Sequence, residues 1–407
     1  MLSWVQQFNT FCFLDNHQYQ LHPHTQECML AAGIRRLVKA NAGTALQQLQ
    51  ATLDEQPGWF FGHLAYDLHS ETEGTTSLLP DRLGFPDLCF FEPEILIRLL
   101  PHELIITAES PATVRQQIEA TLPRWSMPLQ PVSFESRMSR QQYLDTIGNL
   151  QRHILRGDCY EINFCQEFFA ENARIDPLQV YEQLSLVSPN PFSALYRLEN
   201  KWLICASPER FLKKQGDRLL SQPIKGTSPR VQNNQELDSK NKGDLYHSAK
   251  DRSENVMVVD LVRNDMSKVC REGSVQVDEL YGIYSFPQVH QMISTISGEV
   301  ADGQNFSSII RATFPMGSMT GAPKKRVIQL IDQYETQHRG LFSGAVGYIT
   351  PEGDFDFNVV IRSILYNDTT HYVSFPTGSG ITYYSQPQAE WEECQLKAAA
   401  IKQIFSP

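Results

Sequence analysis

The chain has 407 residues, of which 41% are hydrophobic, and its formal net charge is −11. This length is enough for two or three ordinary domains or for one large composite domain, and the composition excludes a disordered or fibrous protein. The negative charge argues against a nucleic acid as partner, because bulk positive charge holds phosphodiester backbones. An acidic protein that binds a small anion needs local donors or a metal ion, so we expect its site to show as motifs.

The cysteines and the ends of the chain indicate the compartment. The eight cysteines form no C-x-x-C pair and the eleven histidines include no H-E-x-x-H motif, which disfavours zinc ribbons and thioredoxin-type sites. Scattered cysteines of this kind are typical of a reduced, cytoplasmic protein. No stretch approaches the roughly 18 uninterrupted apolar residues of a membrane span, and no signal-peptide pattern opens the chain. We therefore predict a cytoplasmic protein that has no contact with a membrane.

A seam at residues 121–140 divides the chain, since three prolines and mixed polar residues interrupt the periodic pattern there. We place a boundary near residue 130, after an N-terminal region (residues 1–130) that carries no recognisable chemical motif. Strands and helices follow one another in mixed runs without a regular βαβ rhythm. This order predicts an α+β fold with antiparallel sheets rather than a doubly wound one.

A helix and a strand follow the seam. Ser139 and Gln142 have the form of a capping box, and the apolar residues then recur at helical spacing until Gly157. Residues 160–164 alternate apolar and polar side chains, which predicts a half-buried strand with Glu161 on its polar face. Further strands are expected at residues 202–206 and 342–349.

Residues 207–227 predict a β-hairpin that turns at Gly216 and Asp217. A two-residue turn brings Glu209 and Lys225 together at the open end, and a one-residue bulge would oppose them directly. On spacing alone, this pair is an ordinary surface ion pair worth about 0–1 kcal/mol. The proline before Lys225 and the Gly-Thr after it instead offer close backbone approach and amide donors. This setting favours a nucleophilic amine with the carboxyl as its proton donor.

Two pairs of acids recur at the i, i+3 spacing that places both side chains on one helical face. Asp251 and Glu254 form the first pair, and Glu390 and Glu393 form the second. The helix dipole favours acids near a helix N-terminus and explains one such pair. Two pairs inside one fold repel each other unless a cation lies between them, and such carboxylates suit Mg²⁺. The final helix is expected to be capped by Ser385 and Gln388 and to bury Cys394, Ala398, Ile401 and Phe405.

Two segments of small residues and one isolated arginine are candidate anion donors. Residues 314–325 run into a helix that Thr320 would cap, with a glycine spacing that differs from a Walker P-loop. Residues 377–380 predict a second loop, just before the final helix. Arg362 lies in an apolar, strand-like run, where an arginine usually has a carboxylate partner, either internal or from a ligand.

Several motifs together resemble the chorismate-utilising enzymes in their order and spacing. They are QPIKGT (222–227), SAKDRSENVMVVDLVRND (248–265), FPMGSMTGAPKK (314–325), SGAVGYI (343–349), VIRSI (360–364), GSG (378–380) and QAEWEE (388–393). The resemblance defines residues 137–405 as a chorismate-binding catalytic region. It implies a large composite αββα fold around a central cleft, with a Mg²⁺ ion that holds the ring carboxylate of chorismate.

Within this family, the residue before the Gly-Thr of the first motif separates two branches. Anthranilate synthases resemble PIAGT, whereas this chain carries the PIKGT typical of the branch that forms aminodeoxychorismate. The resemblance implies that Lys225 attacks C2 of the ring, that Glu209 protonates the departing C4 hydroxyl, and that ammonia then enters at C4. The implied substrate-binding positions are Gly226, Thr227, Arg362, Ser379, Gly380 and Gln291. The implied metal positions are Glu254, Glu390, Glu393 and Asp251.

Two positions depart from the family pattern. Gln291 stands where relatives usually have a catalytic-site histidine, and His290 lies one residue early. Either the glutamine substitutes for that histidine or the local register differs. Glu161 stands where water-using relatives have a lysine base and ammonia-using relatives typically have a glutamine. The missing lysine argues against the water-using branch.

The expected ammonia source is a separate glutamine amidotransferase chain, because no cysteine here lies in a G-x-C-x-G elbow. Component I of anthranilate synthase is the alternative enzyme, and Lys225 argues against it. A chorismate-binding regulatory or scaffold protein is a third hypothesis, which the presence of Lys225, Glu209 and the acid pairs disfavours.

Overall fold

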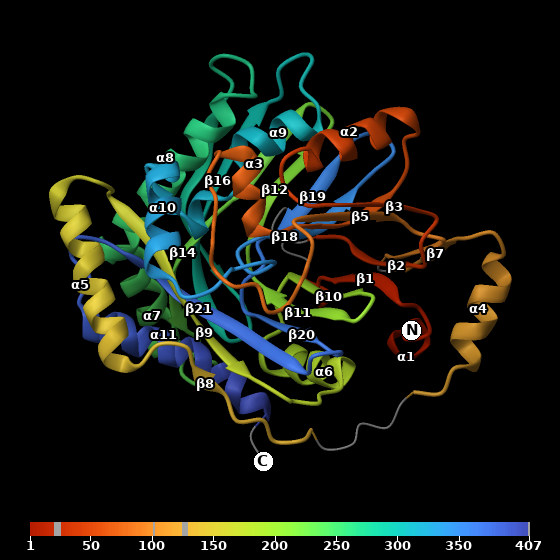
Figure 1. The fold of residues 1–407 in the computed structure, drawn as a ribbon, viewed down its shortest axis with the longest axis horizontal. Coiled ribbons are helices and arrows are strands. Elements are labelled where there is room, and N and C mark those ends of the chain that lie inside the picture. The colour runs from red at the N-terminus through yellow and green to blue at the C-terminus, as the bar shows by residue number, and fades with distance from the viewer. Residues whose placement is uncertain (20–25, 101, 124–128, 406–407) are drawn as a thin grey trace.

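The computed structural model describes residues 1–19, 26–100, 102–123 and 129–405, and two large antiparallel sheets form its centre (Figure 1). The first sheet has 11 strands in the order β17-β9-β21-β20-β11-β10-β1-β2-β6-β7, with β8 also paired to β9. Its strands are β1 (Thr10–Asp15), β2 (Cys28–Ala32), β6 (Ile95–Leu99), β7 (Leu104–Thr107), β8 (Glu135–Ser136), β9 (Glu161–Ala170), β10 (Phe192–Leu198), β11 (Lys201–Ser207), β17 (Gly321–Ala322), β20 (Ser363–Asn367) and β21 (Tyr372–Ile381).

The second sheet has 10 strands in the order β14-β16-β13-β12-β19-β18-β4-β5-β3, with β15 also paired to β16. Its strands are β3 (Arg36–Ala40), β4 (Phe60–Leu64), β5 (Leu88–Glu92), β12 (Arg210–Gln215), β13 (Arg218–Gln222), β14 (Ile224–Pro229), β15 (Gln276–Ser285), β16 (Val289–Glu299), β18 (Ala345–Ile349) and β19 (Phe355–Asn358).

Helices pack against both sheets, so the predicted α+β fold with an αββα arrangement is confirmed. Helices α5, α6 and α11 pack on the first sheet, whereas α2, α8 and α9 pack on the second. The helices are α1 (Leu2–Val5), α2 (Ala45–Glu55), α3 (His69–Thr72), α4 (Pro111–Ala120), α5 (Arg140–Arg156), α6 (Pro177–Val187), α7 (Gln235–His247), α8 (Ala249–Ser267), α9 (Phe306–Thr313), α10 (Lys324–Tyr334) and α11 (Pro387–Lys402). Short 3₁₀ helices are η1 (Tyr66–Leu68), η2 (Gly317–Met319) and η3 (Gln403–Phe405).

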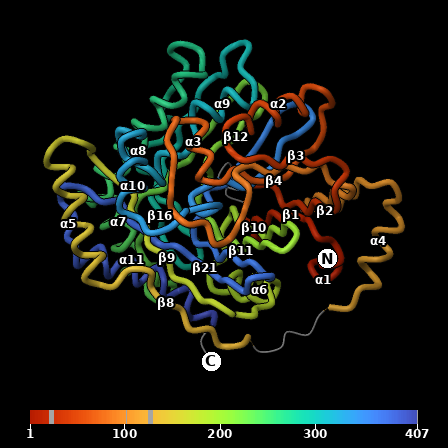
Figure 2. Tube along the Cα trace, in the orientation of Figure 1, coloured from red at the N-terminus to blue at the C-terminus, as the bar shows by residue number. Residues whose placement is uncertain are grey.

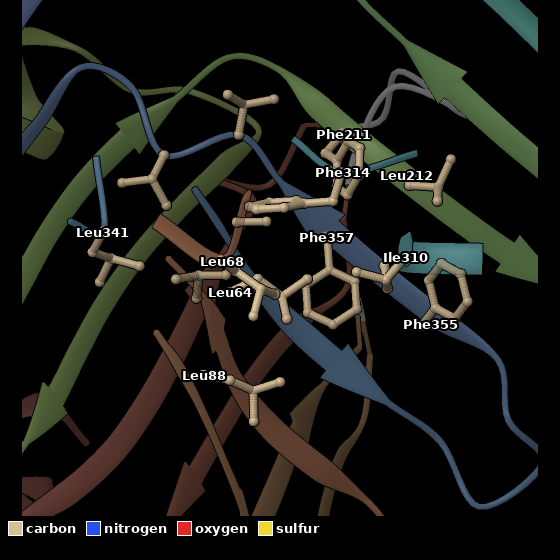
Figure 3. Close-up of a cluster of buried hydrophobic side chains, with 14 of the residues drawn as sticks. Leu64, Leu68, Leu88, Phe211, Leu212, Ile310, Phe314, Leu341, Phe355 and Phe357 are labelled. Carbon is tan, nitrogen blue, oxygen red and sulfur yellow. The ribbon is translucent and has the colours of Figure 1, made fainter. Parts of the chain in front are cut away.

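The hydrophobic core lies between the layers. Figure 3 shows how Phe211, Phe355 and Phe357 of the second sheet gather with Ile310 of α9 and with Phe314, and all of these side chains are buried. Burial of each such side chain contributes roughly 1.5–3 kcal/mol, so the aromatic residues of β12 and β19 fix α9 against this sheet.

The N-terminal region shares both sheets with the rest of the chain. Strand β1 pairs with β10 in the first sheet, and β4 pairs with β18 in the second. In Figure 2 the red and orange N-terminal segments accordingly run beside green and blue segments of the later chain. The regions before and after residue 130 therefore build one common core. Residues 124–128 of the predicted seam lie outside the described residues.

The predicted helix after the seam is α5, and its capping box is present. The Gln142 N–H donates to Oγ of Ser139 at 3.3 Å, and the Ser139 N–H donates to Oε1 of Gln142 at 2.9 Å. Gly157 ends the helix with a φ of 86°, a left-handed conformation that glycine adopts without steric cost. Both ends of this helix confirm the sequence prediction.

Strand β9 differs from its prediction, because it is buried along its whole length rather than half-buried. Strand β21 pairs with one edge of β9, and β8 and β17 pair with the other. Phe164 packs against Tyr143 of α5 on one face. The polar face also points inward, and Nδ2 of Asn163 donates to the carbonyl oxygen of Ser318 at 3.1 Å. The polar side chains at the start of β9 are therefore inside the protein.

Two predictions about loops were wrong. Residues 377–380 belong to β21, where Gly378 lies so close to β9 that a Cβ would be 2.4 Å from Sγ of Cys165. These small residues permit close strand packing rather than a turn. Thr320 does not cap α10, whose N-cap is Pro323, because the Thr320 hydroxyl donates to the carbonyl oxygen of Met316 instead.

The last helix has a different cap from the predicted one. Its N-cap is Gln386, while Oγ of Ser385 accepts the N–H of Thr382. The predicted buried stripe is confirmed at Cys394, Ala398 and Ile401 of this helix, and Phe405 is also buried but lies in η3. All eight cysteines are free, as predicted. Among the residues that the structure describes, no helix is long and apolar enough to cross a membrane.

Candidate active site

Lys225, near the start of β14, points its amine into the protein. Its Nζ donates to Oε1 of Glu161 at 2.7 Å, and only 10% of the lysine side chain and 3% of the glutamate side chain are exposed. Because Glu161 begins β9 of the other sheet, this ion pair joins the two sheets. The predicted desolvated lysine is therefore present where the two sheets meet.

The ion-pair partner of Lys225 is not the predicted Glu209. The hairpin turns at Gly216 and Asp217 as expected, but its bulge lies on β12, so that Arg210 pairs with Gln222. A bulge on this strand moves Glu209 away from direct opposition to Lys225, which lies beyond the hairpin on β14. Glu209 still contributes to the electrostatic field at the amine.

Gly380 of β21 leaves room for this ion pair. A Cβ atom at Gly380 would lie 2.7 Å from Oε1 of Glu161 and 2.9 Å from Nζ of Lys225, closer than real Cβ atoms approach other atoms. Ser379 pairs with Phe164, and its side chain points to the opposite face because successive strand residues alternate. The structure therefore brings Gly380 to the lysine and turns the Ser379 side chain away from it.

Glu209 is a buried acid just before β12. Burial raises the pKa of its carboxyl to about 7, although the charge of Lys225 favours the ionised form. The Glu209 carbonyl oxygen accepts the N–H of Val359 at 3.0 Å, which fixes the backbone here. Glu209 lines a pocket together with Ser221, Pro223, Met266 and Ser318. A carboxyl that keeps its proton near neutral pH has the chemistry of a general acid.

The carboxylates around Lys225 keep the amine charged in the ligand-free protein. Burial opposes the ammonium form, but Glu161, Glu254 and Glu209 together hold the pKa of Lys225 above its ordinary value. Burial also raises the pKa of Glu254 to about 7. Since an ammonium group has no lone pair, Lys225 must lose a proton before it acts as a nucleophile.

Glu254 of α8 and Glu390 of α11 lie on either side of a lysine. Nζ of Lys250 is 3.9 Å from Oε1 of Glu254 and 3.8 Å from Oε1 of Glu390, so an ammonium group lies where the sequence predicted a cation. Oε1 of Glu254 and Oε2 of Glu390 are buried and accept no hydrogen bond within the described part of the chain. Two carboxylates that each have a buried, unused oxygen fit the preference of Mg²⁺ for oxygen ligands.

The other two predicted metal ligands have different neighbours. Oε1 of Glu393 lies 2.8 Å from Nζ of Lys397. Asp251 packs against Gly226, where a Cβ would lie 3.0 Å from Oδ1 of the aspartate, so this glycine permits the close approach of β14 and α8. Over residues 1–19, 26–100, 102–123 and 129–405, no group of three or more His, Cys, Asp or Glu side chains is arranged to hold a metal ion.

Gln291, the first departure from the family pattern, lies beside Thr227 on the neighbouring strand. Gln291 is buried, and its Oε1 has no hydrogen-bond partner among the described residues. His290 is engaged elsewhere, because its ring nitrogens lie 2.8 Å from Oγ of Ser285 and 3.1 Å from Oδ1 of Asp238. The strand register therefore places the glutamine, rather than the histidine, beside the Gly-Thr segment.

Arg362 immediately precedes β20, one residue outside the strand that the sequence predicted for it. Its φ of 52° is left-handed, which costs a non-glycine residue of order 1 kcal/mol or more. Burial lowers the pKa of its guanidinium, which forms no hydrogen bond or ion pair with the described residues, and Glu393 is the acid that favours its charge. An internal carboxylate partner is therefore absent from this part of the chain, which leaves the guanidinium available to a ligand.

Sequence reasoning assigned no role to Lys250 and Glu161. Lys250 stands four residues before Glu254, and this i, i+4 spacing is the signal that predicts their proximity on α8. The pairing of Glu161 with Lys225 spans 64 residues of sequence and two sheets, so no local pattern reveals it.

Comparisons with known proteins identify the family of this chain. A family model for chorismate binding enzymes matches residues 7–403, and the chain therefore belongs to the chorismate binding enzymes. Aminodeoxychorismate synthase component 1 of Escherichia coli is 34% identical over 341 residues, which make up 83% of this chain and 74% of that protein.

Related proteins of a second activity are also similar. Anthranilate synthase component 1 of Thermus thermophilus is 30% identical over 374 residues, which cover 87% of this chain and 80% of that protein. The crystal structure of anthranilate synthase component I from Streptococcus pneumoniae aligns with a TM-score of 0.83 at 23% identity and covers 95% of each chain. This structural likeness shows that the two proteins share the fold.

Proposed function

We propose that this protein converts chorismate and ammonia to 4-amino-4-deoxychorismate, which serves para-aminobenzoate and folate formation. The observation that carries the proposal is the buried amine of Lys225, which interacts electrostatically with the protonatable carboxyl of Glu209. Relatives named aminodeoxychorismate synthase component 1 support the same activity.

In the proposed reaction, the two side chains have complementary roles. The neutral amine of Lys225 forms a bond to C2 of the ring, both conjugated ring double bonds shift, and the C4–O bond breaks. Glu209 gives its proton to the departing hydroxyl, which leaves as water. Ammonia then forms a bond to C4, the two ring double bonds shift back to their original positions, and the C2–N bond breaks to release Lys225. The Glu209 carboxylate takes the proton from the new ammonium group and is ready for the next turnover.

Other residues would hold the substrate. Glu254 and Glu390 would bind a Mg²⁺ ion, which supplies local positive charge for the ring carboxylate when it is bound. Arg362 would bind the carboxylate of the enolpyruvyl group, since its guanidinium has donors to offer. Gly380 would keep space for the ring beside Lys225.

Component I of anthranilate synthase is the second candidate, because a relative of that name matches most of this chain. The feature against it is Lys225, which fills the position before Gly226 with a nucleophilic side chain. The two candidates differ in the ring position that receives nitrogen, so product identity separates them.

The ammonia is proposed to come from a separate glutamine amidotransferase. Relatives named aminodeoxychorismate synthase component 1 imply a second component. With this chain alone, we expect an ammonium salt to support the reaction and glutamine to fail. Addition of an amidotransferase partner should make glutamine effective.

The experiment that tests the proposed function is product identification. The chain is incubated with chorismate, MgCl₂ and an ammonium salt, and the products are separated and identified by mass spectrometry, with and without an added lyase that releases para-aminobenzoate. We expect 4-amino-4-deoxychorismate, and para-aminobenzoate once the lyase is present. Anthranilate as the main product would contradict the proposal.

A further inference from the structure

Glu161 has the geometry of a proton acceptor for Lys225. Its Oε1 accepts a hydrogen bond from Nζ of Lys225 at 2.7 Å, and the glutamate side chain is almost completely excluded from solvent. The second oxygen, Oε2, is buried and has no hydrogen-bond partner within the described residues. A carboxylate with one unused oxygen in a dry site gains little from remaining charged once its lysine partner becomes neutral.

The backbone around Glu161 holds this carboxylate in place. Glu161 pairs with Ala322 of β17, and a Cβ at Gly321 would lie 2.1 Å from the carbonyl oxygen of Glu161. On the other side, Gly380 comes so close that any larger residue would collide with the ion pair. Strands β17 and β21 therefore confine Glu161, and a short, fixed donor–acceptor distance is what proton transfer requires.

Other charged groups face the lysine from several elements. Glu254 on α8, Glu393 on α11 and Glu209 before β12 all interact electrostatically with Lys225, but its hydrogen bond is to Glu161. Glu209 needs its own proton for the leaving hydroxyl in the proposed reaction. Glu161 is therefore the carboxylate that is positioned to accept the proton from the amine.

We propose that Glu161 is a catalytic residue that accepts a proton from Lys225 and so creates the nucleophilic amine. This inference rests on the proposed function. A proton moves from Nζ of Lys225 to Oε1 of Glu161, which converts an ammonium–carboxylate pair into a neutral amine and a neutral carboxylic acid. The amine lone pair then attacks C2 of the ring. When ammonia expels the lysine as a neutral amine, Glu161 returns the proton and the ion pair forms again.

The test uses Glu161→Gln, which keeps the shape and hydrogen-bonding capacity of the side chain but cannot take a proton. The enzyme is mixed with chorismate and Mg²⁺ without ammonia, quenched with acid at short times, and analysed for the mass of a chorismate adduct on Lys225. At pH 7, we expect the variant to form the adduct at least about 100-fold more slowly than the wild type.

The pH dependence separates proton transfer from a structural role. In Glu161→Gln the lysine must lose its proton to solvent, so the ratio of variant to wild-type rate should rise by roughly tenfold per pH unit. Comparing both proteins at each pH cancels the titration of Glu209. Glu161→Asp keeps a carboxylate and should recover much of the rate, and the matched control Glu167→Gln, a buried acid on the same strand, should give a pH-independent ratio.

Three outcomes would overturn this role for Glu161. They are a wild-type adduct rate in Glu161→Gln, an equal loss at every pH, or no recovery in Glu161→Asp while thermal melts show both variants folded. Failure of the proposed function is a different result, because the wild-type protein itself would then form no aminodeoxychorismate from chorismate and ammonium.

Discussion

Two groups of buried charges lie in this protein, and they differ in how completely their polar atoms are paired. In the first group, Arg339 donates to both oxygens of Glu335 at 3.0 and 2.6 Å and to the carbonyl oxygens of Met319 and Asn163 at 2.7 and 2.8 Å. Arg210 likewise forms two hydrogen bonds with Asp356, at 2.8 and 2.9 Å. These bidentate contacts satisfy the charges and tie strands and loops together.

The second group lies near Lys225, Lys250 and Thr227, and it is incomplete. One oxygen each of Glu161, Glu254, Glu390 and Gln291 is buried without a hydrogen-bond partner among the described residues. An unsatisfied buried polar group costs about 1–3 kcal/mol, so a site that contains several is stabilised when a ligand completes it. The comparison teaches that complete charge pairs serve the fold, whereas incomplete ones mark the place where substrate and metal are expected.

The largest effect is expected from Lys225→Ala. Removal of the amine should lower aminodeoxychorismate formation by at least about 10³-fold, because the covalent route is lost while substrate binding is retained. Its loss leaves the buried carboxylate of Glu161 without its ion-pair partner, so the melting temperature should fall. Turnover is measured by product chromatography, and Lys213→Ala is the matched control that should keep normal activity. Unchanged turnover in Lys225→Ala would rule out the covalent mechanism.

In the complete cluster, Asp356→Ala tests a charge pair for which the main loss is expected in stability rather than in turnover. This change leaves the buried guanidinium of Arg210 without its carboxylate and should lower the free energy of unfolding by about 3–5 kcal/mol. Urea denaturation measures the loss. Asp354→Ala breaks the more exposed pair with Lys214 and should cost only about 0–1 kcal/mol. Equal losses in the two variants would show that burial does not set the difference.

Glu209→Gln should lower turnover by about 100-fold, because the leaving hydroxyl loses its proton donor. With a pKa raised to about 7, wild-type Glu209 is protonated below this pH, so wild-type turnover should fall as the pH rises through 7. Because Glu209 keeps its proton inside the fold up to about pH 7 but ionises near pH 4.5 in the unfolded chain, the wild type loses stability as the pH rises from 4.5 to 7, and the variant should lack this loss. A pH–rate profile and melts at pH 5 and 8 test both statements; a falling limb that persists in Glu209→Gln would assign it to another group.

The smallest effect is expected from Lys250→Met. The ammonium group of Lys250 lies between Glu254 and Glu390, and its removal should tighten Mg²⁺ binding by up to about fivefold, in keeping with the weak energy of a half-exposed ion pair. Calorimetric titration of Mg²⁺ measures this affinity without any turnover. Lys397→Met, which loses a pair with Glu393 only, is the comparison variant. Weaker Mg²⁺ binding in Lys250→Met would contradict the expectation that the Lys250 ammonium group and Mg²⁺ compete for the two glutamates.

The sequence predicts local features better than contacts between sheets. The capping box at Ser139, the end of α5 at Gly157 and the hairpin turn at Gly216 follow from side-chain patterns over a few residues, and all are present. The bulge position depends on how β12 pairs with β19 as well as with β13, which no local pattern encodes. The small residues at 377–380 are typical of a turn and equally of closely packed strands.

In the candidate site, too, the sequence indicates individual residues better than the contacts between them. Lys225, Glu209, Glu254 and Glu390 carry motif signals in their own segments, and the structure brings them into one interior region. The partner of Lys225 comes from β9, which only the meeting of the two sheets determines. Glu161 therefore stood out in the sequence only as a departure, and its contact with the lysine required the fold.

The most direct measurement of the central claim is the mass of the peptide that contains Lys225 after reaction with chorismate in the absence of ammonia. The protein is quenched within the first turnover, digested and analysed by mass spectrometry. A covalent route through Lys225 predicts a peptide that is heavier by the mass of chorismate less one water, and this adduct should disappear when ammonium is added before the quench. An unmodified Lys225 peptide at every time point, in a preparation that forms aminodeoxychorismate with ammonium, would contradict the account.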